Sequence, residues 1–163
     1  MFRVAVITSS DSGYEGKRED KSGPEIERIV KEYGYEVVHT IILPDERKIL
    51  ADEMMRIADN NIADLILTTG GTGFSKRDWT PEATKDIVER EVPGIPEAMR
   101  SYSLQITKRA MLSRAAAGIR KETLIINMPG SPKAVDECLQ YIISELDHGL
   151  KILKGTASNC ARK

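Results

Sequence analysis

The chain has 163 residues, of which 40% are hydrophobic and 30% are charged. Its 24 Lys and Arg residues against 25 Asp and Glu give a net charge of -1, which excludes the broadly basic surface that binds duplex nucleic acid. No apolar run approaches the roughly 18 residues of a membrane span, and the first residues do not have the pattern of a signal peptide. Two cysteines, Cys138 and Cys160, exclude a disulfide scaffold and suit a reducing compartment. We therefore predict a cytoplasmic protein with a single domain over 1–163 and a frayed tail over 155–163.

Four short apolar runs predict the strands of a parallel sheet. Each is rich in β-branched residues and apolar on both faces, as is typical of strands buried between two layers of helices. In chain order the runs cover residues 4–7, 37–43, 62–67 and 124–126.

The segments between these runs have the apolar spacing of amphipathic helices. Ser22 and Glu25 predict a capping box at the start of the first helix, and Gly34 predicts its end. The helical stripes cover residues 26–33, 50–58 and 135–153. Strands that alternate with helices predict an α/β domain with right-handed crossovers.

The stretch from 91 to 120 is harder to interpret. A Pro-Gly-Ile-Pro run at 93–96 breaks the helix that begins at Pro81, and a further helix is expected over 97–108. The alanine-rich run at 115–119 predicts either a short strand or a close-packed turn.

Ligands of an open parallel sheet bind beyond the carboxyl ends of its strands, so the residues after each predicted strand are the candidates for a site. All four loops carry small, polar or turn-forming residues. They cover residues 8–13, 44–46, 69–81 and 127–132. Because these loops meet at one edge of the sheet, their convergence means more than any single motif.

A glycine turn follows the third predicted strand, with Gly70, Gly71, Thr72 and Gly73 in succession. Glycines permit positive φ, and their consecutive N–H groups can form an anion-binding nest. The alternative is a tight strand-to-helix turn without a ligand. The turn is neither a P-loop, which ends in Gly-Lys-Ser/Thr, nor a dinucleotide fingerprint, because the third glycine is replaced by Lys76.

Asp45 and Asp78 are the two carboxylates that fall in these loops. Hard oxygen ligands suit Mg²⁺, which keeps several waters and bridges to substrate phosphates. A carboxylate-held Mg²⁺ would stabilise the charge that develops on a transferred phosphoryl group. As alternatives, Asp45 is a helix N-cap and Asp78 is a turn residue ahead of a helix capped by Thr80.

Basic and capping residues also flank the loops. Lys76, Arg77 and Arg114 are candidates for neutralising phosphates. Ser131 predicts the cap of the last helix, whose N-terminus would favour an anion; the alternative is an ordinary cap.

Four blocks of the chain resemble the MogA/MoaB family of molybdopterin-binding proteins and the similar G domains of gephyrin and its plant counterpart. The blocks lie at residues 69–73, at 77–83, at 112–114 with Gly118, and at 127–132. The resemblance extends from about residue 3 to about residue 155. It implies a three-layer α/β/α sandwich around a mostly parallel sheet. It also implies that ATP donates AMP to the terminal phosphate of molybdopterin in molybdenum cofactor biosynthesis, with release of pyrophosphate.

The same resemblance implies roles for individual residues. Asp45 and Asp78 match the family's two essential aspartates, which handle Mg²⁺ and the phosphates. Ser113 and Asn127 match positions that contact the nucleotide or product, and the glycine turn matches the nucleotide cradle. Further substrate or nucleotide contacts are implied at Ser9, Asp11, Ser22, Gly23, Gly130 and Ser131.

The resemblance further implies a homotrimer, or a hexamer built from trimers, and a separate protein that inserts molybdenum. The charged run at 14–19 departs from the family pattern and has no assigned role. The alternatives to an enzyme are a non-catalytic, molybdopterin-binding MoaB-type paralogue and a trimeric scaffold. A nucleotide-dependent dehydrogenase is disfavoured by the missing third glycine. Copper-bound or free molybdopterin, and a molybdenum or tungsten pathway, stay open.

Overall fold

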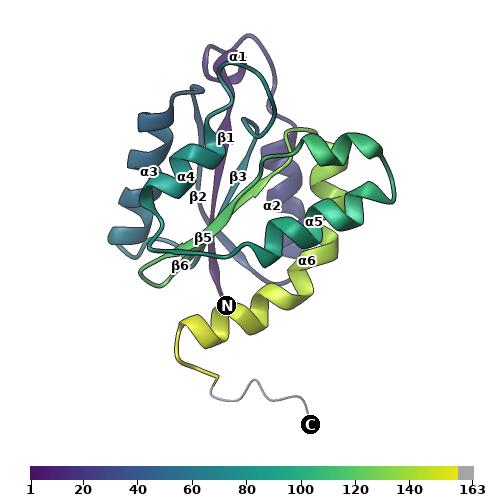
Figure 1. Ribbon diagram of the computed structural model, residues 1–163. Helices are drawn as coiled ribbons and strands as arrows, with labels where there is room; N and C mark the ends of the chain where they lie inside the picture. Colours follow the sequence, from purple (N-terminus) through teal and green to yellow (C-terminus); the bar gives the residue numbers. More distant parts are fainter. Residues whose placement is uncertain (158–163) are drawn as a thin grey trace.

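The computed structural model describes residues 1–157 (Figure 1). One six-stranded sheet has the order β2-β1-β3-β6-β5-β4. Four of its strands are parallel: β1 (Arg3–Ser9), β2 (Glu36–Leu43), β3 (Leu65–Thr69) and β6 (Thr123–Met128). β5 (Ala117–Arg120) runs antiparallel to β6, and β4 (Arg90–Glu91) runs antiparallel to β5. Most of the expected tail at 155–163 lies outside the described residues.

Helices cover both faces of this sheet. On one face are α2 (Ser22–Glu32), α5 (Gly94–Leu104) and α6 (Pro132–Leu153); on the other are α3 (Arg47–Asp59) and α4 (Thr80–Ile87). The short α1 (Asp11–Tyr14) and the 3₁₀ helix η1 (Lys108–Leu112) lie in connections. This arrangement confirms the three-layer α/β/α sandwich.

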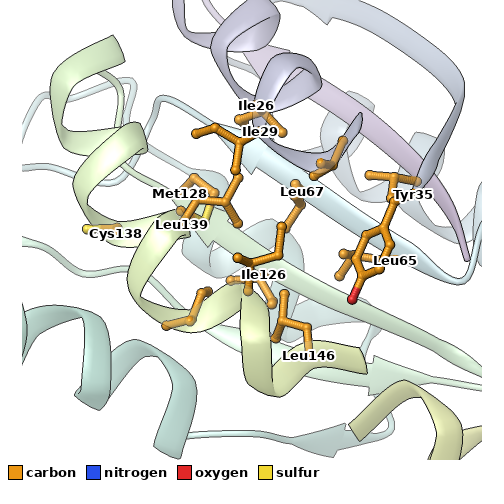
Figure 2. Packing of buried hydrophobic residues seen from close by; sticks show 14 of the residues in the cluster. Ile26, Ile29, Tyr35, Leu65, Leu67, Ile126, Met128, Cys138, Leu139 and Leu146 are labelled. Carbon is orange, nitrogen blue, oxygen red and sulfur yellow. The ribbon is translucent and has the colours of Figure 1, made fainter. Parts of the chain in front are cut away.

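Alternation along β1 explains why its sequence is apolar throughout. Val4 and Val6 belong to the core beneath α2 and α6, whereas Ala5 and Ile7 belong to the core beneath α3 and α4. All four are fully buried. Figure 2 shows the first core, in which helix residues such as Ile26 and strand residues such as Leu65 and Ile126 pack together. A strand covered on both sides needs apolar residues at every position.

Some predicted boundaries are wrong. The third strand starts at Leu65 rather than at residue 62, because Asn61 adopts a positive φ of 52° and the Ile62 N–H still bonds to the end of α3. Ser22 does not cap α2; the carboxylate of Asp20 accepts the Gly23 N–H at 3.0 Å instead. α5 starts at Gly94, ahead of the predicted start at 97.

The run at 115–119 contains the start of β5, so the strand alternative is correct. Ser131 caps α6 as predicted, because its hydroxyl accepts the Ala134 N–H at 3.2 Å. Within residues 1–157, no helix combines the length and the apolar composition that crossing a bilayer requires.

Candidate active site

The candidate site lies at the carboxyl edge of the parallel strands. Ser9 at the end of β1 is in register with Leu43 at the end of β2, and Thr69 at the end of β3 is in register with Met128 at the end of β6. β3 lies between β1 and β6. The four loops that follow these strands therefore emerge at one edge, as the sequence predicted.

Hydrogen bonds fix the carboxylate of Asp45 at this edge. Its Oδ1 accepts the Ser9 hydroxyl at 2.5 Å, and its Oδ2 accepts the Asp11 N–H at 2.9 Å. The Asp45 N–H in turn donates to Asp11 Oδ1 at 2.9 Å. The helix-cap interpretation of Asp45 is wrong, because Glu46 occupies the N-cap position of α3 and the Asp45 side chain is held elsewhere. Each carboxylate oxygen retains a second lone pair for another ligand.

The glycine turn needs its glycines for both conformation and close packing. Gly70 and Gly71 have φ values of 86° and 71°. A Cβ on Gly70 would overlap the Ser9 carbonyl, and one on Gly71 would overlap the Thr80 hydroxyl and lie 3.2 Å from Ser9 Oγ. Among the described residues, no acceptor receives the backbone N–H groups of Gly71, Thr72 and Gly73. Three successive free N–H groups form the kind of concavity that binds an anion.

Asp78 lies at the other end of this turn. Its Oδ2 accepts the Ser75 N–H at 3.0 Å and would lie 3.0 Å from a Cβ on Gly73. Asp45 adjoins the Gly71 end through the Ser9 hydroxyl. The two acids therefore flank one backbone turn, although Asp78 also closes the local turn that the alternative interpretation required. The predicted cap at Thr80 is wrong, because Trp79 occupies the N-cap position of α4 and the Thr80 hydroxyl donates to the Gly70 carbonyl at 2.9 Å.

The guanidinium of Arg114 forms hydrogen bonds that stabilise the glycine turn, so it is not free to bind a phosphate group. Its guanidinium donates to the Gly73 carbonyl at 2.7 Å and to the Asp78 carbonyl at 2.8 Å, and it pairs with the carboxylate of Glu82. Its backbone N–H donates to the Thr72 carbonyl at 2.9 Å. The carbonyl groups of Thr72 and Gly73 are thus engaged by Arg114, whereas the N–H groups of the turn have no acceptor among the described residues.

Arg77 is also engaged with protein acids. It donates two hydrogen bonds to the carboxylate of Asp11, at 2.6 and 3.0 Å, and one to Glu46 at 3.0 Å. Hydrogen bonds from Arg77 and from the Asp45 N–H hold the pKa of Asp11 below its ordinary value. The same pairing raises the pKa of Arg77.

Asn127 is fully buried and satisfied within the protein. Its Oδ1 accepts the Ala116 N–H at 3.0 Å, and its Nδ2 donates to the hydroxyls of Thr68 and Thr84 at 3.0 and 2.8 Å. The sequence resemblance implied contact with the nucleotide or product at Asn127. The structure places this side chain where it joins β6 to α4 and to the segment before β5. Ser113, by contrast, is half-buried and lines a cavity.

Two cavities lie on either side of the glycine turn. The larger, of about 460 Å³, includes Ser9 and Gly70 in its lining, together with Ser22, Gly130 and the basic pair Arg18 and Lys21. The smaller, of about 300 Å³, is mainly apolar and includes Thr72, Gly73 and Ser113, with Met99, Leu112 and Cys138. Sequence reasoning gave no individual role to Arg18 or Lys21, whose only signal was their place in the charged part of the first loop.

Three other candidate residues, Asp45, Asp78 and Gly23, do not line either cavity. Asp45 lies one hydrogen bond behind Ser9, and Asp78 lies beside Gly73. Gly23 contributes its N–H to the Asp20 cap, where a Cβ would overlap the Asp20 carboxylate. Within residues 1–157, no group of three or more His, Cys, Asp and Glu side chains could hold a metal ion. Two carboxylates nevertheless suit Mg²⁺ that completes its coordination with water and phosphate oxygens.

Comparisons with known proteins agree with one another. Residues 5–148 match the family model described as "Probable molybdopterin binding domain". Molybdopterin adenylyltransferase from Helicobacter pylori J99 is 39% identical over 156 residues, covering 94% of this chain and 89% of the relative. The crystal structure of MoaB from Thermus thermophilus has a TM-score of 0.90 and 43% identity, covering 95% of this chain and 98% of its own. The tungsten cofactor synthesizing protein MoaB from Pyrococcus furiosus has a TM-score of 0.83 and 37% identity, covering 94% and 98%.

Proposed function

The chain belongs to the molybdopterin-binding domain family, and from this premise we propose that it is a molybdopterin adenylyltransferase of molybdenum cofactor biosynthesis. The reaction transfers AMP from ATP to the terminal phosphate of molybdopterin and releases pyrophosphate. One observation supports the proposal above all: a turn with three free N–H groups lies between Asp45 and Asp78. Such a turn suits phosphate oxygens, and the flanking acids suit the cation that accompanies them.

The protein's part in this reaction is positioning and charge stabilisation. The free N–H groups of the turn donate to phosphate oxygens, while Arg114 keeps the turn's conformation. Asp45 and Asp78 would hold Mg²⁺, which when bound neutralises charge on the phosphates. The molybdopterin phosphate then forms a bond to the α-phosphorus of ATP, and the bond to pyrophosphate breaks. No proton transfer by a side chain is needed, because the attacking phosphate of molybdopterin and the departing pyrophosphate are both already ionised.

The two cavities offer places for the two ring systems. The smaller cavity suits a flat, mostly apolar ring, because Met99, Leu112 and Cys138 line it and Ser113 adds a polar contact. The larger cavity suits a more polar ligand, because its lining combines the hydroxyl group of Ser9 with two basic and two acidic residues, Arg18, Lys21, Glu19 and Asp20.

The family resemblance also supports a wider biological setting. We propose that the chain acts as one domain, in the cytoplasm where ATP is available, as a homotrimer or as a hexamer built from trimers. Four apolar side chains are exposed near η1, which suits contact with another subunit: Leu104, Ile106, Met111 and Leu112. Molybdenum insertion falls to a separate protein.

A non-catalytic molybdopterin-binding protein or scaffold is the second candidate. One observation favours it: both oxygens of Asp45 already accept hydrogen bonds from the protein. A metal ligand would have to use the remaining lone pairs. Binding of molybdopterin that is indifferent to ATP and Mg²⁺ would support this candidate.

Incubation with molybdopterin, ATP and Mg²⁺ tests the proposal. We expect adenylylated molybdopterin and pyrophosphate in equal amounts, and neither product without Mg²⁺. Asp78→Ala should abolish both products while the variant stays folded, because the half-exposed Asp78 carboxylate makes a single local hydrogen bond. No product from the wild-type chain, under conditions in which a family enzyme is active, would contradict the proposal. Wild-type turnover by Asp78→Ala would contradict the site.

A further inference from the structure

Arg77 connects the two loops that carry Asp45 and Asp78. Its guanidinium donates to both oxygens of Asp11, at 2.6 and 3.0 Å, and reaches Glu46 at 3.0 Å. Asp11 and Asp45 then exchange two hydrogen bonds of 2.9 Å between backbone N–H groups and carboxylates. A chain of hydrogen bonds therefore runs from the residue that precedes Asp78 to the carboxylate of Asp45.

The geometry of these contacts constrains both position and orientation. A guanidinium that bonds both oxygens of a carboxylate fixes the plane of the pair as well as its distance. Asp11 passes this constraint to Asp45, whose other oxygen is held by Ser9 at 2.5 Å. Arg77 itself has 49% of its side chain exposed, and exposed ion pairs add little to stability. The ion pair between Arg77 and Asp11 is therefore poorly explained by a contribution to folding stability alone.

We propose that Arg77 is a positioning residue that sets the separation of Asp45 and Asp78, and with it the affinity of the site for magnesium-bound ATP. The proposal rests on the adenylyltransferase function proposed above. It assigns Arg77 to the protein's own acids, through Asp11 and Glu46, rather than to the phosphates. From the sequence alone, Arg77 is instead a candidate for neutralising phosphate.

The chain offers a closely matched control in Arg28. Arg28 is 45% exposed, donates two hydrogen bonds to Glu25 at 3.1 and 2.6 Å, and reaches Glu32 at 2.7 Å. Like Arg77, it pairs with both oxygens of one carboxylate and reaches a second acid, and it also reaches Asp136 of α6 at 3.2 Å. It lies on α2, outside the loops that carry Asp45 and Asp78. Loss of either arginine removes one exposed, forked ion pair.

Calorimetric titration with ATP at graded Mg²⁺ concentrations, without molybdopterin, tests the proposal by binding alone. We expect Arg77→Gln to raise the dissociation constant of magnesium-bound ATP about tenfold or more, with a melting temperature close to that of the wild type. Arg28→Gln should bind as the wild type does. Equal affinities for Arg77→Gln and the wild type would overturn the proposal. Should Arg77→Gln not fold, Arg77→Lys gives the same test, because it keeps the charge and loses the fork.

A mutant cycle that combines Arg77→Gln with the paired substitution Asp11→Asn and Glu46→Gln separates positioning from direct contact. If Arg77 acts through these two acids, the triple variant binds magnesium-bound ATP about as weakly as the Asp11→Asn, Glu46→Gln variant alone. If the two losses multiply, Arg77 contacts the nucleotide itself and the proposal is overturned. A wild-type chain that binds ATP but makes no adenylylated product would contradict the proposed function and leave the binding result to decide on Arg77. A wild type that shows no magnesium-dependent ATP binding would overturn both.

Discussion

The hydroxyl of Ser9 donates to the carboxylate of Asp45 at 2.5 Å and stands 3.2 Å from where Gly71 would carry a Cβ. One small side chain at the end of β1 thus links a proposed metal ligand to the backbone turn proposed to hold phosphate. Ser9 is buried, whereas Asp45 is half-buried, so this hydrogen bond lies at the border between the protein interior and the site.

We expect Ser9→Ala to reduce kcat/KM for ATP about tenfold, because Asp45 loses the donor that orients its Oδ1. The free energy of unfolding should fall by only about 1 kcal/mol, the usual cost of one hydrogen bond. Steady-state kinetics and urea unfolding measure the two quantities. Ser144→Ala, an exposed site on α6, is the control. An unchanged kcat/KM in Ser9→Ala would show that Asp45 does not need this contact.

Gly71→Ala should destabilise the protein by about 1–3 kcal/mol and abolish detectable ATP binding. The new methyl group would occupy a residue with φ of 71° and overlap the Thr80 hydroxyl. Thermal unfolding and calorimetry give both results. Gly149→Ala is the matched control, since that helical glycine has open space around it and should gain about 0.5–1 kcal/mol. Normal ATP affinity in a folded Gly71→Ala variant would count against the turn as the phosphate site.

Asn127→Ala should cost about 2–4 kcal/mol of stability, because the Ala116 N–H loses its acceptor and the buried hydroxyls of Thr68 and Thr84 lose the amide group that donates to them. In the folded variant, the KM for ATP should stay within about twofold of the wild type. Unfolding curves and kinetics at low temperature measure these effects. The opposite result, a large rise in KM with unchanged stability, would restore Asn127 as a ligand contact.

The lowered pKa of the buried Asp64 carboxyl predicts how the free energy of unfolding changes at acid pH. Burial alone raises its pKa, but hydrogen bonds from Arg3 and Lys154 outweigh burial and bring the pKa from 3.8 to about 2. A carboxyl whose pKa is lower in the folded state stabilises the protein above the unfolded pKa. That contribution, on the order of 2 kcal/mol, should be lost as the pH falls from about 4 to about 2. Unfolding free energies measured across this range should converge for the wild type and Asp64→Asn. Parallel curves would refute the assignment.

The α/β alternation and the parallel strands followed from local patterns in the sequence, whereas the three-layer sandwich was implied by the family resemblance. Apolar runs at 4–7 and 124–126 and the helical stripe at 135–153 are consequences of burial, so they can be recognised one segment at a time. The third strand was placed too early, because Ile62 is apolar and β-branched yet belongs to the turn that ends α3. Nothing in the residue types marks that difference.

The edge at which the site forms was also predictable, since parallel strands end together. The roles of individual side chains were not. Arg114 and Asn127 make their contacts across 11 to 59 positions of sequence, and such pairings exist only once the chain has folded. Arg77 was identified as a cation near phosphate, but its partners on two other loops could not be read from its neighbours.

The glycine turn separates two hollows, with Gly70 lining the larger and Thr72 and Gly73 lining the smaller. Under the proposed function, the two reactants occupy separate hollows that adjoin one backbone segment. Direct in-line transfer within a ternary complex then requires no adenylylated enzyme intermediate. Double-reciprocal plots for the two reactants should therefore intersect, whereas a ping-pong scheme would give parallel lines.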